Sequence, residues 1–342
     1  MDGGFLLKDV ALQAGVSLAT ADRVLHGRGG VRAQTARRVR EALEELARQR
    51  EHAALIGRSF LVDVVMEAPE RFTAAVRAAA EREIASLRPA AFRLRFHLVE
   101  TPRLAEMVAL LTRIARRGSH GVILKAPDVP EIGACVQALA AARIPTVTLV
   151  TDLPKSPRRA YVGMDNRAAG ETAAYLIAAW LRGQSSGVLV TLSSSRFQGE
   201  EEREIGFRRV LRAAAPALRI TEISEGRGID RETGALVGAA LAADPGIDAV
   251  YSIGGGNAAI VDAFAAAGRR CAAFIGHDLD SDNLRLLRAG RIGAVLHHDL
   301  RQDMRLACRH IMHAHGALPA AAVGASLSSV QVVTPFNLPA GI

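Results

Sequence analysis

The sequence of 342 residues is poor in aromatic side chains, which make up only 4% of it. Any hydrophobic core must therefore be built mainly from Ala, Val, Leu and Ile. Cysteine is also scarce: Cys135, Cys271 and Cys308 are far apart and odd in number, and no CxxC pair occurs. This usage excludes a disulfide framework and is typical of buried thiols in a reducing cytosol.

Targeting, membrane and catalytic signals are missing as well. No apolar run approaches the roughly 18 residues of a membrane span. The segment 1–10 is interrupted by charged residues, so it does not read as a secretory signal, and we expect a cytoplasmic protein. The run at 254–257 (GGGN) is not a nucleotide loop, and Ser193–Ser195 lacks the glycines of a nucleophile elbow. We expect no enzyme activity and no cofactor.

A cluster of histidines near the C-terminus is the only hint of a metal. His310, His313 and His315 have spacings that could place two imidazoles on one helical face. No Cys, Asp or Glu stands nearby in sequence with ligand spacing. A solvated helix end explains the cluster better, so we expect no metal.

What the chain has in excess is positive charge. Its net charge is +8 and its pI is about 10.2. A basic balance favours an acidic partner, with nucleic acid the first candidate, although basic residues also simply solubilise a surface. Net charge alone therefore does not identify a nucleic-acid partner, and a DNA-binding sequence motif is needed as well.

The first fifty residues supply that motif. Helical spacing predicts a helix over 8–14, and Gly15 can end it cheaply because glycine adopts positive φ. Ser17 is a good N-cap for a second helix over 18–25. Two short helices joined by a glycine-containing turn indicate a helix-turn-helix. The apolar stripe of a third helix, over 33–47, would close the small core.

The segment DVALQAGVSLATADRVLHGRGGVRAQTARRVREALEEL resembles the DNA-binding head of the lactose-repressor (LacI/GalR) family. The family pattern is approximately D-V-A-x-x-A-G-V-S-x-x-T-x-S-R-V-L followed by V-x-x-x-T-R-x-x-V. The positions that fit it are Asp9, Val10, Ala11, Ala14, Gly15, Val16, Ser17, Thr20, Arg23, Val24, Val31, Thr35, Arg37 and Val39. The resemblance implies a DNA-binding head over 1–47 and a hinge or linker over 48–58.

The resemblance also implies how the head contacts a double-stranded operator. The second helix lies in the major groove, with Leu18, Ala19 and Arg23 toward the base edges. Arginine can bridge guanine O6 and N7, whereas the other two side chains make apolar contacts. Residues expected at the phosphates, which hold register without reading sequence, are Ser17, Thr20, Arg32, Gln34 and Thr35; Thr20 is equally well explained by packing. Asp22 replaces the usual serine and needs a cationic partner.

For the linker over 48–58, the sequence leaves two structures possible. In the family, this segment folds into a hinge helix on the operator, and a leucine opens a minor-groove step. Leu55 or Ile56 is our candidate for that wedge. The usual Asn-Pro before the hinge is absent, and a plain tether is the alternative.

From residue 59 onward, continuous apolar strands alternate with helices, which indicates parallel sheets covered on both faces. We predict an α/β body of two lobes over 59–342. The first lobe takes about 59–150 and 279–325, and the second takes about 160–275 and 326–342. The connections expected to cross between lobes lie near 149–162, 275–279 and 325–335. The arrangement resembles the type-I periplasmic sugar-binding fold that the same repressor family uses.

That resemblance places an effector in the cleft between the lobes, at loops that follow strands. Asp278, in IGHDLD, is the best single candidate because a carboxylate there can accept two vicinal hydroxyls. Arg203 matches the family's R-x-x-G-F segment, and Phe72 could stack on a sugar face or belong to the core. The remaining candidates are Asp152, Asp165, Asn257, which follows three glycines that would open space, and His298, where the family often has Gln.

Together these features predict a sequence-specific transcriptional regulator, most simply a repressor, that acts as a homodimer. A small polar effector of the sugar or polyol class would control it. The alternatives are a solute-binding protein of a sugar transporter and an architectural DNA binder without an effector. The first would need a signal peptide and no head, and the second would not respond to any ligand.

Overall fold

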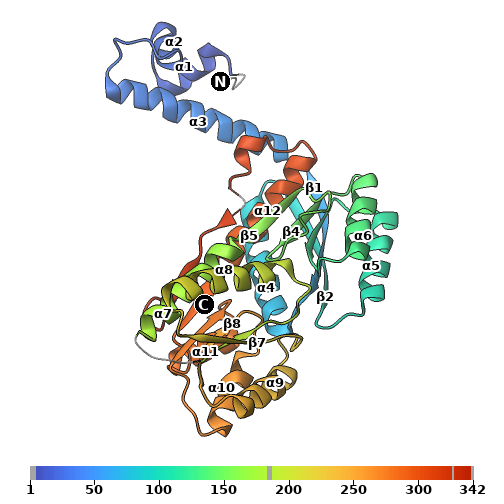
Figure 1. The fold of residues 1–342 in the computed structure, drawn as a ribbon. Helices are drawn as coiled ribbons and strands as arrows, with labels where there is room; N and C mark the ends of the chain where they lie inside the picture. Colours follow the sequence, from blue (N-terminus) through green and yellow to red (C-terminus); the bar gives the residue numbers. More distant parts are fainter. Residues whose placement is uncertain (1–4, 183–186, 326, 340–342) are drawn as a thin grey trace.

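A computed structural model describes residues 5–182, 187–325 and 327–339 of the chain. A small helical head stands apart from a larger body, and one long helix joins them (Figure 1). The body consists of two lobes, each built on a six-stranded, mainly parallel sheet. This confirms the predicted fold class. None of the described helices is long and apolar enough to cross a membrane.

The head is a three-helix unit: α1 (Leu7–Ala14), α2 (Leu18–Leu25) and α3 (Ala33–Leu55). Helix α1 ends where Gly15 adopts φ of +60°, and Ser17 caps α2 by accepting a hydrogen bond from the Thr20 amide. Val10 and Val39 are almost completely buried between α1 and α3. The local signals therefore suffice to form the turn, and the small core holds the helices together.

The linker prediction is wrong in one respect: no separate element follows the head. Helix α3 continues without a break through 48–55, where no proline or glycine interrupts it. Of the two candidates for the wedge, Leu55 is only 7% exposed and packs into the core of the first lobe, whereas Ile56 is 65% exposed. In this structure the segment is thus a rigid extension of α3 docked on the body. Leu55 would have to leave that core to reach a DNA groove.

The first lobe contains a sheet with the strand order β11-β5-β4-β3-β1-β2. Helices α4, α5, α6 and α12 belong to this lobe. The bounds are β1 Ser59–Glu67, α4 Glu70–Ile84, β2 Ala91–Val99, α5 Leu104–Arg117, β3 Gly121–Lys125, α6 Pro130–Ala141, β4 Thr146–Leu149, β5 Ala160–Met164, α12 Leu300–Ala314 and β11 Leu327–Ser328, with short 3-10 helices at Ala85–Leu87 and Ala320–Ala322. Buried Val, Leu, Ile and Ala dominate the core, as the shortage of aromatics requires.

The second lobe has the strand order β12-β10-β9-β8-β6-β7, and only β12 is antiparallel to its neighbour. Helices α7 to α11 belong to it. The bounds are α7 Asn166–Trp180, β6 Gly187–Thr191, α8 Gln198–Ala214, β7 Arg219–Ile223, α9 Asp230–Ala243, β8 Ile247–Ser252, α10 Asn257–Ala266, β9 Ala273–His277, α11 Ser281–Arg288, β10 Ala294–His297 and β12 Gln331–Val333.

The chain crosses between the lobes three times, and two crossings differ from the prediction. The first follows β5, which pairs with β4 and so belongs to the first lobe up to residue 164. The second lies between β10 and α12, near 298, because β10 pairs with β9 of the second lobe. The third, between β11 and β12, falls inside the predicted 325–335. The first lobe therefore takes 59–164, and the stretch 279–297 belongs to the second.

Candidate functional site

Helix α2 presents a continuous outer surface to solvent. Leu18 is 53% exposed, Ala19 and Arg23 are exposed beside it, and Ala21 on the opposite side is completely buried. A helix exposed in this way can enter a major groove without any rearrangement of the head. The three side chains predicted to face base edges are thus all accessible.

The polar residues around α2 are already ordered. The hydroxyls of Ser17 and Thr20 lie 2.9 Å apart, in addition to the capping bond between these two residues. Asp22, the acidic departure from the expected pattern, is paired with Arg28 Nη1 at 2.7 Å. This pair neutralises the carboxylate at the helix surface.

The phosphate candidates lie where α3 begins. Arg32 is the N-cap residue of α3; it and Gln34 are exposed, and Thr35 is half-buried. Helix α3 is held to the end of α1 by Arg38, whose Nη2 donates to the carbonyl oxygen of Ala14 at 2.7 Å. The start of α3 is therefore fixed relative to the recognition helix.

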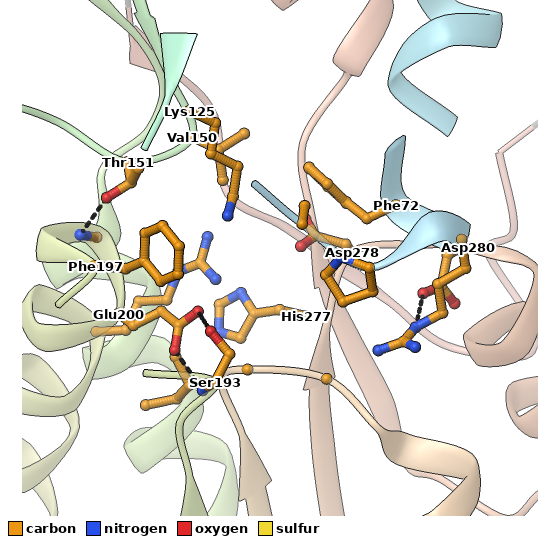
Figure 2. Close-up of a pocket in the computed structure, with 18 residues that line it drawn as sticks. Phe72, Lys125, Val150, Thr151, Ser193, Phe197, Glu200, His277, Asp278 and Asp280 are labelled. Carbon is orange, nitrogen blue, oxygen red and sulfur yellow. Dashed lines mark hydrogen bonds and ion pairs between the residues drawn. The ribbon is translucent and has the colours of Figure 1, made fainter. Parts of the chain in front are cut away.

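A cleft opens in the body between the two lobes, and Figure 2 shows the residues that line it. Strand ends from both sheets meet there: Lys125 ends β3, Val150 follows β4, Ser193 follows β6, Ile253 follows β8 and His277 ends β9. The carboxyl ends of parallel strands are the usual ligand edge of an α/β sheet. In this closed arrangement the cavity is small, about 60 Å³.

Arg203 reaches the cleft from α8 and is 3% exposed. Its Nε donates to Asn166 Oδ1 at 2.8 Å, which fixes the guanidinium, while its buried Nη2 has no partner in the described residues. The position of α8 depends on glycines: a Cβ on Gly170 would lie 1.9 Å from the Arg203 carbonyl oxygen, and one on Gly206 would lie 2.3 Å from the Arg167 oxygen. Only a very close crossing of α7 and α8 places this donor.

Asp278 lies directly after β9 and belongs to a buried charge chain. His298 Nε2 is 3.5 Å from Asp278 Oδ1, and His298 Nδ1 contacts Asp303 on the other side. Burial opposes the charge of this histidine, but the two carboxylates outweigh it and raise the pKa of His298 to about 9. Burial likewise disfavours the Asp278 carboxylate, yet His298 and Arg203 hold its pKa well below the usual range. Asp278 is therefore an ionised acceptor.

Asp278 also has an unusual backbone. Its φ is +63°, a region that side chains with a Cβ adopt rarely and Asp and Asn adopt most readily. Val150, on the facing lobe, has φ of +68°. Strained residues of this kind cluster at ligand sites, because the surrounding structure must hold them in place.

Two further charged residues face each other across the cleft. Lys125 lies with its Nζ 4.0 Å from the centre of the Phe197 ring, which the second lobe contributes. The Glu200 carboxylate is held by Ser193, whose amide donates to Oε2 at 2.7 Å and whose hydroxyl contacts Oε1. The floor of the cleft thus combines an aromatic ring with fixed polar groups, as sites for small polar ligands do.

Arg71, on α4 of the first lobe, bridges the entrance to the second lobe. Its Nε lies 3.0 Å from Asp280 Oδ2, and its Nη2 donates to the Gly228 carbonyl oxygen at 2.7 Å. A backbone hydrogen bond of 2.8 Å from the amide of Asp128 to the carbonyl oxygen of Arg196 also joins the lobes. The described structure is therefore a closed form of the cleft.

Comparison with protein families assigns both parts of the chain. The model described as bacterial regulatory proteins, lacI family, matches residues 6–49, and the model described as periplasmic binding protein domain matches residues 65–314. The chain belongs to the periplasmic binding protein domain family through its body, and its head matches the lacI family model. It therefore combines a DNA-binding type of head with a periplasmic-binding-protein type of body, as the motif in the first fifty residues predicts. A search of curated proteins finds no match.

Solved structures show what the body is similar to. A glucose-galactose binding protein from Geobacillus stearothermophilus is 22% identical, with a TM-score of 0.72, and the alignment covers 82% of this chain and 99% of that one. A solute binding protein from Agrobacterium vitis with bound D-fucose is 19% identical, with a TM-score of 0.71 and coverages of 83% and 97%. A proposed LacI transcriptional regulator from Bacteroides fragilis is 15% identical, with a TM-score of 0.70 and coverages of 82% and 98%. At these identities the likeness shows a shared fold.

The structure brings together some of the effector candidates. Phe72, Arg203 and Asp278 line the cleft. His298 is completely buried behind Asp278 and reaches the cleft only through that carboxylate. It contacts Asp278 from behind and keeps that carboxylate ionised, and it does not face the open space itself.

Three other candidates are used elsewhere. Asp152 forms an ion pair with Arg158 and accepts from Thr148 Oγ1 at 2.7 Å. Asp165 is the exposed N-cap of α7, bonded to the amide of Ala168. Asn257 is buried and donates to Asn283 Oδ1 at 2.6 Å. None of the three lines the cleft among the described residues, so their predicted contact with an effector has no support in this geometry.

The triple glycine also has a different reason from the one predicted. A Cβ on Gly254 would lie 2.0 Å from the Ser193 amide nitrogen, and Gly255 and Gly256 adopt φ of +89° and +75°. Close approach of two loops and left-handed backbone require glycine here. The space that the glycines leave is a consequence of that turn.

Sequence reasoning missed several cleft residues, namely Arg71, Lys125, Thr151, Ser193, Phe197, Glu200, His277 and Asp280. Lys125 and His277 end strands, so the rule that ligands meet carboxyl ends of strands could have found them. Arg71 and Asp280 come from separate lobes, and no local pattern marks them.

Proposed function

We propose that the chain is a transcriptional repressor whose affinity for an operator is set by a small polar effector of the sugar or polyol class, bound between the lobes. One observation carries this proposal. Buried polar atoms of Arg203 and His277 lack hydrogen-bond partners in the described residues, and both residues line the same cleft as the ionised Asp278. A buried polar group without a partner costs about 1–3 kcal/mol, so a ligand that supplies partners gains that amount.

The head supports operator recognition. The exposed outer face of α2 carries Arg23, which can donate to guanine O6 and N7. A single small head buries too little surface for a tight complex, and two heads on a pseudo-palindromic site supply the missing affinity. The proposal therefore includes a homodimer.

The body supports control of the head by the ligand. Helix α3 runs directly from the head to Leu55 in the core of the first lobe. A ligand that binds the closed cleft more tightly than the open one shifts the equilibrium toward closure by that difference. Closure turns one lobe against the other, which changes the separation of two heads in a dimer.

The two alternatives make different demands on the molecule. A transporter's solute-binding protein has no use for an exposed recognition helix on a rigid stalk, although the body shares its fold with such proteins. An architectural DNA binder has no use for a cleft with buried, unpartnered polar atoms. A ligand-controlled transcriptional regulator is the interpretation that accounts for both the exposed recognition helix and the polar cleft.

The test combines two measurements on the full chain. Thermal unfolding is screened against sugars, polyols and nucleosides, and each compound that raises the melting temperature is added to gel shifts with DNA from upstream of the gene. We expect at least one compound to stabilise the protein and to change operator affinity; the direction of that change distinguishes an inducer from a corepressor. Absence of salt-sensitive preference for any duplex would refute the proposal.

A variant pair separates the cleft from the head. Asp278→Asn keeps the side-chain shape and tolerates the positive φ, but it removes the ionised acceptor. We expect it to lose the response to the stabilising compound and to retain operator binding. Asp165→Asn, outside the cleft, is the control and should respond as the wild type does. A full response in Asp278→Asn would remove this residue from the site.

A further inference from the structure

Two buried cations in the cleft make no direct contact with a carboxylate, and the acidic residues Glu200 and Asp278 act on them only from a distance. Lys125 is 9% exposed and Arg203 is 3% exposed. In the described part of the chain, neither forms an ion pair with a carboxylate within 4.0 Å. A buried charge is expensive unless it is paired, so an arrangement of two such cations facing one space requires an explanation.

The hydrogen bonds of Lys125 leave most of its capacity unused. Its Nζ donates to the Glu67 carbonyl oxygen at 2.8 Å and lies over the Phe197 ring. An ammonium group has three donors, so two remain. Figure 2 shows the Lys125 side chain directed into the open centre of the cleft, toward the same space as His277.

His277 adds a neutral donor. Its Nε2 lies 2.8 Å from the Tyr251 hydroxyl, and its Nδ1 has no partner among the described residues. Burial raises the pKa of Tyr251 and lowers that of His277, so the phenol keeps its proton and the imidazole is neutral. When the phenol donates to Nε2, the ring hydrogen stands on Nδ1 and is available to a ligand.

The acceptors of the cleft are fewer and already engaged. Both oxygens of Glu200 are held by Ser193. Asp278 Oδ1 lies 3.5 Å from Nε2 of the charged His298, so Oδ2 is the carboxylate oxygen left to accept from a ligand. The free hydrogen-bonding capacity of the site is therefore mostly that of donors, two of them on cations. A neutral sugar hydroxyl both donates and accepts, whereas a carboxylate or phosphate only accepts and also carries charge.

We infer that the effector carries an acidic group, a carboxylate or a phosphate on a polyhydroxylated body, and that Lys125 and Arg203 bind this group while Asp278 accepts hydroxyls. This inference rests on the proposed function and deepens it. Lys125 is one of only three lysines in a chain otherwise rich in arginine, and the other described lysines, Lys8 and Lys155, lie on the exposed surface. A compact ammonium at this position suits a single anionic group held at one point.

The experiment compares each neutral sugar with its acidic counterparts on the full-length protein. Thermal unfolding and titration calorimetry at constant ionic strength use D-glucose, D-gluconate, D-glucuronate and glucose 6-phosphate, and then D-galactose with D-galacturonate. We expect at least one acid to bind at least about tenfold more tightly than its neutral parent, as the loss of a charge-assisted hydrogen bond implies. The carboxylate and phosphate arms show which acidic group fits.

Variants at Lys125 test the assignment. Lys125→Met keeps the length of the side chain and removes the charge, so the preference for the acid should be lost while operator binding remains. Lys125→Arg retains a cation and should retain part of the preference, which keeps the test informative if the Met variant folds poorly. Lys155→Met is the matched control on the exposed surface and should behave as the wild type does.

The outcomes separate this inference from the function on which it rests. A neutral sugar that stabilises the protein and alters operator binding more than its acids do overturns the acidic class and leaves the sugar-responsive regulator intact. Equal binding of the acid by wild type and Lys125→Met overturns the role of Lys125. If no member of either series binds, the acidic-sugar class is overturned; if the broader screen also finds no effector, the proposed function fails with it.

Discussion

Arg71 Nε of the first lobe lies 3.0 Å from Asp280 Oδ2 of the second, and this pair spans the mouth of the cleft. Both side chains are largely buried, at 17% and 7% exposed. Asp280 also caps α11 through the Asn283 amide, so its position is fixed by its own lobe. The contact is a latch: it exists only when the lobes are closed.

Removal of the latch should open the cleft. We expect Arg71→Met to increase the radius of gyration in small-angle X-ray scattering and to weaken effector binding about tenfold, because a charge-assisted pair is lost only from the closed form. Arg82→Met changes an exposed arginine on the same helix and is the control. Burial raises the pKa of Asp280 to about 6, so the wild-type latch should also be weaker at pH 5 than at pH 7.5. Identical scattering for both variants would argue against the latch.

The buried His298 should make stability depend on alkaline pH. Its pKa is about 9 in the folded protein and near 6.5 when it is unfolded, so its contribution is complete below pH 6.5 and disappears as pH rises through about 9. We expect the melting temperature to fall over this interval and His298→Gln to flatten the fall. His26→Gln, on the exposed surface of the head, should leave the profile unchanged. A wild-type melting temperature constant from pH 6.5 to 9.5 contradicts this prediction.

The crossing of α7 and α8 should tolerate no added methyl group. Gly170→Ala places a Cβ against the Arg203 backbone, which must move and carry the cleft arginine with it. We expect a loss of about 1–3 kcal/mol in the free energy of unfolding together with weaker effector binding. Gly133→Ala, inside α6 with open space around it, is the control and should be neutral or stabilising by up to about 1 kcal/mol. Chemical denaturation measures both, and equal stability of the two variants would refute the argument.

Leu55 should couple the head to the body. Truncation in Leu55→Ala removes buried apolar contacts at the end of α3, with an expected cost of about 2–3 kcal/mol. Proteolysis within 48–58 should become faster, and the effector should have less influence on operator binding. The neighbouring Ile56 is 65% exposed, so Ile56→Ala serves as the matched control. If both variants are cleaved at the wild-type rate, the helix is held by other contacts.

Arg23 should read sequence. Arg23→Ala is expected to cost about 1–3 kcal/mol of operator binding and to relax the preference at one base pair in a binding-site selection. Arg285→Ala, far away on α11 of the second lobe, should have no effect on either. Wild-type selectivity in the Arg23→Ala protein would assign the base contact to another side chain.

The head was predictable because its signals are local. Gly15, Ser17 and the apolar positions around Val10 act within a few residues of one another, and α2 has the predicted bounds. The end of α3 was not predictable in the same way. Without a proline or glycine the helix had no local reason to stop, and Leu55 is held by a core assembled from distant segments.

Apolar strands alternating with helices determined the α/β class and the existence of two sheets, because a strand buried on both faces must be apolar along its length. They could not determine which sheet each strand joins. The burial patterns of β5 and β10 are nearly uniform, and only pairing with β4 and β9 assigns them to their lobes. Because strand pairing was unknown, two of the predicted crossings between the lobes were misplaced.

The sequence by itself determined the lacI-type head and the layered body, and motif resemblance pointed to Arg203 and Asp278, which line the cleft. Tertiary structure alone decided that Lys125 and His277 lie beside Arg203 and that Arg71 meets Asp280. The physical reason is that a side chain's partners depend on strand order and lobe closure, which bring together residues more than two hundred positions apart. A linear pattern records the preference of each segment for helix or strand, but it does not record those distances.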